Sequence, residues 1–165
     1  MVTLTAGKTA PDFSLKTLDG KDFSLKSALA QGPVVLAFFK VSCPTCQYAF
    51  PYFERLFQSY KNKGATLVGV SQNGAKDTTA FAKQFGVTFP ILLDDAATYA
   101  VSNAYGLTNV PTLFWVAQDG EIEVASVGWA KGDYETVGRK LAESGKVAPA
   151  VLFKPGEEVR DFKAG

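Results

Sequence analysis

Apolar and polar positions along the chain alternate between strand-like and helix-like segments. Val34–Phe39 is apolar without alternation, which is typical of a strand covered on both faces. Over residues 43–61 apolar side chains recur three and four positions apart, as on one face of a helix. Thr66–Val70 predicts a second buried strand, residues 76–85 a second helix and Ile91–Leu93 a short strand. Buried strands joined through helices predict parallel neighbours with right-handed crossovers.

Two segments of the chain have the pattern of a β-hairpin. The string Asp-Phe-Ser-Leu-Lys occurs at residues 12–16 and again at 22–26, on either side of an Asp-Gly turn. Its Phe and Leu alternate, so the apolar side chains of each copy lie on one face of a strand. Residues 112–116 and 122–127 also flank an Asp-Gly pair and predict a second hairpin.

Together these elements predict the α/β class, with a mixed central sheet flanked by helices on both faces. Asp94 or Asp95 is a candidate cap for a helix ending near residue 104, and a last helix is expected to start at Asp133. No linker divides the chain, so we expect one domain over residues 1–165. The tail 147–165 is apolar enough to dock on this domain, and partial order is the alternative.

Composition removes several classes of function. The chain of 165 residues is 47% hydrophobic, enough for a core, and its net charge of +1 offers nothing to nucleic acid or another polyanion. The longest strictly apolar run, six residues, is far short of the roughly 20 that a membrane span needs. The absence of histidine excludes Ser-His-Asp and Cys-His catalysis and histidine-ligated zinc.

The first residues of the chain bear on its compartment. They have no charged-then-apolar leader, so we expect a cytoplasmic protein. The bacterial periplasm or cell envelope is the alternative, if a signal peptide was trimmed.

Both cysteines lie in one tetrapeptide, Cys43-Pro44-Thr45-Cys46, between the first buried strand and the helix after it. Cysteines three apart in a helical turn have Cβ atoms roughly 5–6 Å apart. A disulfide needs about 3.5–4.5 Å, so a modest tightening of the turn would close it. Pro44 falls at the first helical position, where its missing N–H costs nothing. Such a pair can open and close without unfolding the chain, as a redox site requires.

The place of each cysteine in the helix predicts its role. Cys43 is near the N-cap, where free N–H groups and the helix dipole favour a thiolate. Cys46 is one turn inside and should keep its proton longer. We therefore expect Cys43 to attack a substrate disulfide and Cys46 to resolve the mixed disulfide. The alternatives are an inert buried pair, or half of a zinc site that a second chain completes.

Short motifs along nearly the whole chain support the interpretation of the two cysteines as a redox pair. They are Ala10-Pro11-Asp12-Phe13, Leu18-Asp19-Gly20, Val35–Phe39 before the cysteines, Pro51 after them, Val68–Ser71, Phe89-Pro90, Tyr105-Gly106, Val110-Pro111-Thr112 and Asp119-Gly120. With these motifs the chain resembles the thioredoxin superfamily. Within it, the chain looks like the redoxin branch shared by alkyl hydroperoxide reductase/thiol-specific antioxidant proteins and TlpA-type thiol-disulfide oxidoreductases.

The resemblance implies a thioredoxin fold with an N-terminal β-hairpin and a redoxin-type insert. It also implies that the Val110-Pro111 bond is cis, with an ordinary trans turn as the alternative. A cis bond would present the Val110 backbone beside the cysteines, where an extended substrate could pair with it. Val110 and Pro111, with Pro44 and Thr45, are therefore the candidate substrate-binding residues.

The function implied is thiol-disulfide oxidoreduction by a monomer with no bound cofactor and no metal. Its expected partners are protein or small-molecule disulfides and thiols, together with a dithiol electron donor. No nucleic acid partner and no membrane span are expected.

Three positions depart from the family pattern. Thioredoxin has a buried Asp six residues before its first cysteine, where this chain has Ala37. TlpA-type proteins carry a Glu three residues after the second cysteine, where this chain has Ala49, and the usual Trp before the first cysteine is Ser42. The usual proton acceptor for the resolving thiol is therefore missing. Lys40 is a candidate for lowering a thiol pKa by its charge, with a solvent-exposed side chain as the alternative.

A peroxiredoxin-like thiol peroxidase is the alternative function. That mechanism needs a Thr or Ser three residues before the peroxidatic cysteine, a Pro seven before it and an arginine for the peroxide. The corresponding positions are Lys40 and Leu36 for Cys43, and Cys43 and Phe39 for Cys46. None of them fits, so a peroxidase that uses both cysteines is the second hypothesis.

Overall fold

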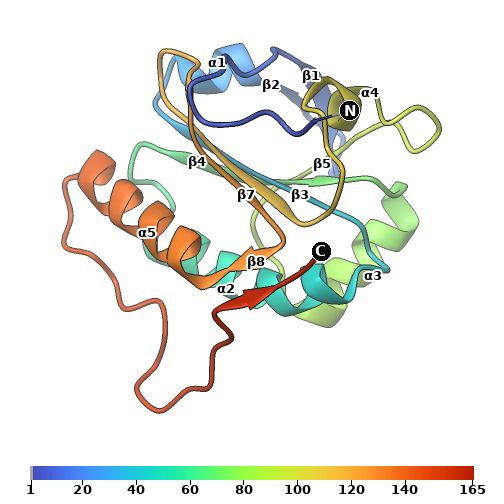
Figure 1. The fold of residues 1–165 in the computed structure, drawn as a ribbon. Helices are drawn as coiled ribbons and strands as arrows, with labels where there is room; N and C mark the ends of the chain where they lie inside the picture. Colours follow the sequence, from blue (N-terminus) through green and yellow to red (C-terminus); the bar gives the residue numbers. More distant parts are fainter. Residues whose placement is uncertain (1) are drawn as a thin grey trace.

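A computed structural model describes residues 2–165 and shows a seven-stranded mixed sheet between two layers of helices (Figure 1). The strands follow the order β2-β1-β5-β4-β3-β6-β7. Their bounds are β1 Ser14–Thr17, β2 Asp22–Ser24, β3 Val34–Phe39, β4 Thr66–Ser71, β5 Ile91–Leu93, β6 Thr112–Val116 and β7 Ile122–Val127. The helices are α1 Leu25–Leu29, α2 Pro44–Tyr60, α3 Ala75–Phe85, α4 Ala100–Ala104 and α5 Lys131–Gly145. The α/β class is the one predicted.

Strand β3 lies in the interior of the sheet and leads directly into the cysteine motif. It pairs in parallel with β4 and antiparallel with β6, and all of its side chains are buried. Because successive side chains of a strand point to opposite faces, its odd-numbered residues pack with α2, α3 and α5. Its even-numbered residues pack with α1 and α4 on the other face. The sequence pattern of a doubly covered strand is confirmed.

The predicted connections between strands are also confirmed. β3, α2 and β4 form one parallel crossover, and β4, α3 and β5 form a second. β1–β2 and β6–β7 are antiparallel hairpins.

A pair of small residues sets the packing of α2 on the sheet. Ala37 of β3 is the register partner of Gly69 of β4. A Cβ at Gly69 would lie 2.9 Å from a ring carbon of Phe89 and 3.3 Å from one of Phe39. The Phe50 ring of α2 lies 4.6 Å from that of Phe39 and 5.5 Å from that of Phe89, centre to centre. Small residues in the strands thus make room for the aromatic layer that holds α2.

The start of α4 differs from the prediction, although its end at residue 104 agrees. The helix begins at Ala100, after Tyr99 in a left-handed conformation with φ of 51°. Asp94 still caps it from upstream, because its carboxylate accepts the backbone N–H groups of Val101 and Ser102 at 3.2 and 2.8 Å. The loop folds back, so the capping carboxylate comes from a residue that is close to the helix start in space but six positions before it in the sequence.

The start predicted for the last helix is wrong by two residues. Helix α5 begins at Lys131 rather than at Asp133. Trp129–Ala130 form a short strand, β8, which pairs antiparallel with β9, Phe162–Lys163. The helix starts as soon as this pairing ends. Figure 1 shows β9 in red beside β8, and neither of these two-residue strands, nor α1, is predicted from the sequence.

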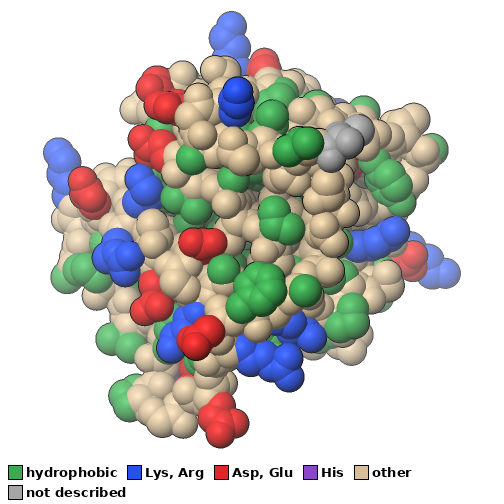
Figure 2. Space-filling model, in the orientation of Figure 1, with side chains coloured by type: hydrophobic (Ala, Val, Ile, Leu, Met, Phe, Trp, Pro, Cys, Tyr) green, Lys and Arg blue, Asp and Glu red, His purple; other side chains and the backbone are tan. Residues whose placement is uncertain are grey.

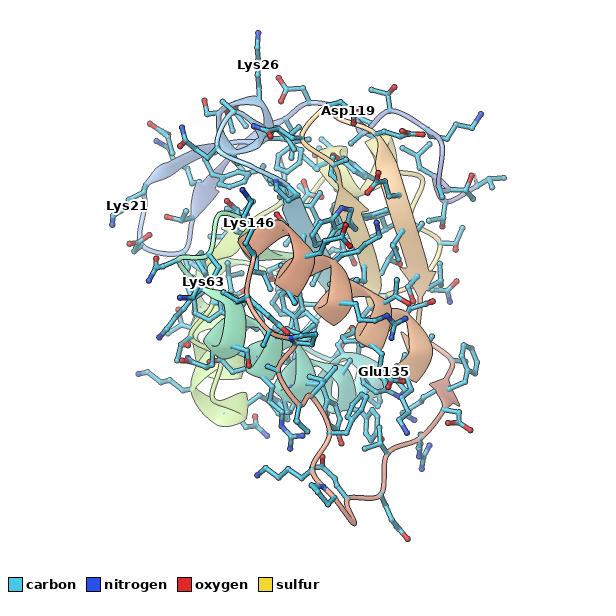
Figure 3. All side chains as sticks on the ribbon, turned by 90° about the vertical axis from the view of Figure 1, so that its left-hand side faces the viewer. Lys21, Lys26, Lys63, Asp119, Glu135 and Lys146 are labelled. Carbon is cyan, nitrogen blue, oxygen red and sulfur yellow. The ribbon has the colours of Figure 1, made fainter. Side chains whose placement is uncertain are left out.

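The segment after α5 runs along α2 before it reaches β9. Figure 3 shows it as a loop below α5, the helix in which Glu135 is labelled and which Lys146 follows directly. The Tyr60 hydroxyl accepts the backbone N–H of Ala150 at 2.7 Å. Arg55 donates two hydrogen bonds of 2.7 Å to the carboxylate of Glu157.

Within residues 2–165, no helix is both long and apolar enough to cross a membrane.

Replacing Gly69 with Val is expected to destabilise the protein by about 1–3 kcal/mol, because the new side chain overlaps the rings of Phe39 and Phe89. Urea unfolding followed by circular dichroism measures the change. Gly132→Ala is the control, since a Cβ there meets nothing within 4 Å. Equal midpoints for the two variants would contradict the packing described for α2.

Candidate active site

The cysteine motif forms the first turn of α2. Cys43 is the N-cap residue, and its sulfur accepts the backbone N–H of Cys46 at 3.0 Å. Pro44 occupies the first helical position, where no hydrogen bond to its nitrogen is required. Both thiols are free. The cap predicted from the sequence is confirmed, and one turn of helix brings the two cysteines together.

The two thiols differ in burial and in pKa. Cys43 is half-buried, whereas Cys46 is fully buried. Hydrogen bonding from Cys46 lowers the pKa of Cys43 to about 6, and the backbone N–H of Thr45 and the charge of Lys163 act in the same direction. Burial raises the pKa of the Cys46 thiol, as does its hydrogen bond to Cys43. At neutral pH Cys43 is therefore the thiolate and Cys46 the thiol.

The loop before β6 lies next to the sulfur of Cys43. The Val110-Pro111 bond is cis, as the resemblance implies. The Val110 carbonyl oxygen lies 3.3 Å from the Cys43 sulfur and accepts a hydrogen bond from the protonated thiol. Val110 is itself half-buried. The candidate residues Val110 and Pro111 thus adjoin Cys43, although they are separated from it by more than 60 positions in the chain.

The C-terminal segment also reaches the motif, which sequence reasoning missed. The buried Thr45 hydroxyl donates a hydrogen bond of 2.6 Å to the carbonyl oxygen of Ala164. Lys163 supplies the side-chain charge that lowers the Cys43 pKa. The candidate for this effect, Lys40, instead has its ammonium group 5.8 Å from the centre of the Tyr99 ring. No periodicity in residues 160–165 signals this placement.

Aromatic side chains close the interior side of the motif. Trp129 is fully buried, 5.4 Å from the ring of Tyr48 and 4.4 Å from that of Tyr134, centre to centre. Its indole N–H donates to the carbonyl oxygen of Arg160 at 2.6 Å. Trp129 therefore lies behind the C-terminal segment rather than at the surface of the site.

No carboxylate stands at the two positions where related proteins keep an acid near the resolving thiol. Ala37 and Ala49 are both buried in the same cluster as Cys46. Tyr134 belongs to this cluster, and its hydroxyl is buried with no hydrogen-bond partner among the described residues. Burial raises the Tyr134 pKa, as does the negative charge of a Cys46 thiolate, so the hydroxyl stays protonated.

The site contains too few ligands for a metal within one chain. The part of the chain that the structure describes holds no group of three or more His, Cys, Asp or Glu side chains arranged around one point. Two thiols supply only half of the four ligands that zinc takes in structural sites.

Comparisons with known proteins agree with this arrangement. The sequence model of the AhpC/TSA family matches residues 6–125. The chain belongs to the AhpC/TSA family. Among curated relatives, the thiol-disulfide oxidoreductase ResA of Geobacillus thermodenitrificans is 33% identical over 126 residues, which are 76% of this chain and 71% of the relative. The resemblance found in the sequence is thereby confirmed.

Solved structures show the same fold. The thioredoxin domain of a thiol-disulfide oxidoreductase from Bacteroides vulgatus has a TM-score of 0.74 at 23% identity, covering 84% of this chain and 99% of that one. The peroxidoxin BcpB from Mycobacterium tuberculosis has a TM-score of 0.68 at 23% identity, covering 87% and 97%. The predicted thioredoxin fold is confirmed. Because a protein named thiol-disulfide oxidoreductase and one named peroxidoxin share it, the fold alone does not decide between activities.

Alkylation of the reduced protein by iodoacetamide is expected to follow an ionisation near pH 6. A thiolate reacts and a thiol does not, so lowering the Cys43 pKa moves the rise in rate to lower pH. A free cysteine derivative, with its pKa of about 8.5, is the control. Peptide mapping should place the label on Cys43. A label first on Cys46, or a rate still rising through pH 8.5, would contradict the assignment.

Proposed function

We propose that this protein is a thiol-disulfide oxidoreductase in which Cys43 attacks the substrate and Cys46 resolves the intermediate. The observation that carries this proposal is the difference between two thiols in one helical turn. One is a half-exposed N-cap thiolate held by N–H groups, and the other is buried and protonated. The AhpC/TSA family match and the relative named thiol-disulfide oxidoreductase support it.

In the first step the Cys43 thiolate attacks one sulfur of a substrate disulfide. A bond forms between Cys43 and that sulfur, and the substrate S–S bond breaks. The other substrate sulfur leaves as a thiolate, which takes a proton from solvent. Hydrogen bonding from Cys46, by its thiol and by its backbone N–H, keeps Cys43 ionised before the attack.

In the second step Cys46 loses its proton and attacks the sulfur of Cys43. The Cys43–Cys46 disulfide forms, the mixed disulfide breaks, and the second substrate sulfur leaves as a thiolate that takes up a proton. Two electrons have then passed from the protein dithiol to the substrate. A dithiol donor restores the pair by the same exchange in reverse. Because one chain carries both cysteines, a monomer suffices.

Substrate binding involves the residues around the reactive sulfur. The Val110 backbone beside Cys43 offers polar groups to an extended substrate, and Pro111 shapes the loop that presents it. Pro44 is exposed beside Cys43 and can contact a substrate directly, whereas Thr45 is buried with its hydroxyl on Ala164, so it acts on the substrate only through the C-terminal segment. Figure 2 shows basic and acidic side chains interspersed on the face that carries the C-terminal strand, so this face has no large area of one charge.

The contacts of the three arginines support a thiol peroxidase less well than a thiol-disulfide oxidoreductase. A peroxidatic site needs an arginine beside its cysteine, but the Arg55 guanidinium is engaged by Glu157 in the C-terminal segment. Arg139 donates to the hydroxyl of Thr136 on the surface of α5. Arg160 lies 5.9 Å from the centre of the Tyr48 ring. Each arginine therefore has a partner other than the sulfur of Cys43.

Cys43→Ser is expected to reduce the rate of insulin disulfide reduction by dithiothreitol to background, because the attacking sulfur is gone. Cys46→Ser should also stop turnover but accumulate a covalent mixed disulfide at Cys43, visible by mass spectrometry. Hydrogen peroxide consumption is measured in parallel. Equal activity in the two variants would overturn the roles. Fast peroxide turnover with no disulfide reduction would favour the peroxidase.

A further inference from the structure

The segment Phe162–Gly165, here named the C-terminal strap, crosses the surface beside the reactive cysteine. It begins as strand β9 on the edge of β8 and continues past Thr45, which donates to Ala164. It ends against the loop that presents Val110, where the Asn109 amide donates to the carbonyl oxygen of Gly165 at 3.4 Å. Figure 1 shows this course, from the red arrow to the label C.

Two glycines show how closely the strap is fitted. A Cβ added to Gly165 would lie 2.3 Å from the carbonyl oxygen of Val110. A Cβ added to Gly128 would lie 2.8 Å from the carbonyl oxygen of Lys163. The backbone of the strap therefore contacts the backbone of Val110 at Gly165 and the backbone of Gly128 at Lys163, with no side chain between them. The Val110 carbonyl that faces Cys43 is the one that Gly165 covers.

The strap occupies the place that an extended polypeptide substrate would need. A polypeptide disulfide brings its flanking residues with it, and these must lie along the backbone next to Cys43. At Val110 that backbone is already in contact with Gly165. A bound polypeptide and the strap therefore exclude each other.

The strap is attached in a way that permits local release. Phe162 is 62% exposed, so the strap contributes little to the core. The chain before it is held separately, because the Trp129 indole and the Tyr48 hydroxyl both bond the backbone of Arg160. Weakly buried segments with few contacts open at low free-energy cost while the rest of a protein stays folded.

A small disulfide does not meet the same obstacle. Cys43 remains half-exposed with the strap in place. Val110 also lines a cavity of about 280 Å³ together with Lys40, Tyr99 and Asn109, and Cys43 is not part of its lining. The strap residues do not line this cavity. A compact disulfide needs only the exposed part of Cys43 and no pairing along the Val110 backbone, so the strap does not have to move.

We propose that the C-terminal strap makes this protein selective between disulfide substrates: small disulfides react with the strap in place, whereas polypeptide disulfides react only after it is displaced. The proposal rests on the proposed oxidoreductase function and names a substrate-dependent step in it. The apparent affinity for a polypeptide is reduced by the fraction of molecules with the strap open. The same limit does not apply to a small disulfide.

Two variants open the strap by different means. Gly165→Ala places a methyl group against the Val110 backbone, which cannot yield as a flexible side chain would, so the strap must move. Deletion of Gly165 alone uncovers the Val110 carbonyl and keeps Lys163, the hydrogen bond between Thr45 and Ala164, and the Arg160 contacts. Gly132→Ala, a glycine on α5 with open space around its Cα, is the matched control. Thermal unfolding verifies that each variant is folded.

Reduction of insulin is compared with reduction of 2-hydroxyethyl disulfide, with dithiothreitol as donor. The assays run at pH 8, above the Cys43 pKa of about 6. Both strap variants are expected to raise kcat/KM for insulin by about three- to tenfold through a lower KM. Their kcat/KM for 2-hydroxyethyl disulfide, and both values for Gly132→Ala, should stay within about twofold of the parent protein.

The remaining outcomes separate the two proposals. If the parent protein reduces 2-hydroxyethyl disulfide but the strap variants leave insulin reduction unchanged or slower, strap selectivity is overturned and the proposed function stands. Equal gains for both substrates also overturn it, because the strap would then limit access in general. If the parent protein reduces neither substrate, the proposed function fails and the strap proposal fails with it.

Discussion

The site depends on the hydrogen bonding that Cys46, through its thiol and its backbone N–H, provides to the sulfur of Cys43 in the first turn of α2. The backbone N–H of Cys46 points at the sulfur of Cys43, because the first N–H groups of a helix have no partner within the helix. A sulfur placed there is stabilised as an anion, while the second sulfur, one turn deeper, is covered by the aromatic core and keeps its proton. The two chemical roles proposed for one residue type follow from a difference in depth of a single helical turn.

The rest of the fold holds this turn in place. Small residues in β3 and β4 admit an aromatic layer under α2, so the helix start is fixed relative to the sheet. From the other side, the loop before β6 brings the Val110 carbonyl to Cys43, and the C-terminal strap covers that carbonyl in turn. Three segments distant in sequence therefore meet at one sulfur, and only one of them contains a cysteine.

Much of the architecture could be predicted because it is encoded locally. A continuous apolar run at Val34–Phe39, helical spacing after Cys43 and Asp-Gly pairs between alternating strands each carry their own signal within ten to twenty residues. The N-cap position of Cys43 follows from Pro44 behind it. The starts of α4 and α5 lack such signals and were predicted less well. Asp94 caps α4 from a position several residues before its start, and Ala130, just before α5, belongs to strand β8.

By itself, then, the sequence determined the fold class, the cysteine motif and which cysteine is ionised, because each depends on neighbours within one turn or one strand. The tertiary structure alone decided which charge lies near Cys43, since Lys163 reaches it from the far end of the chain while Lys40, three residues away, faces Tyr99. It also decided that the strap covers Val110. A two-residue strand has too few positions to show alternation, so its partner is chosen by backbone hydrogen bonds and shape, which no local pattern of side chains records.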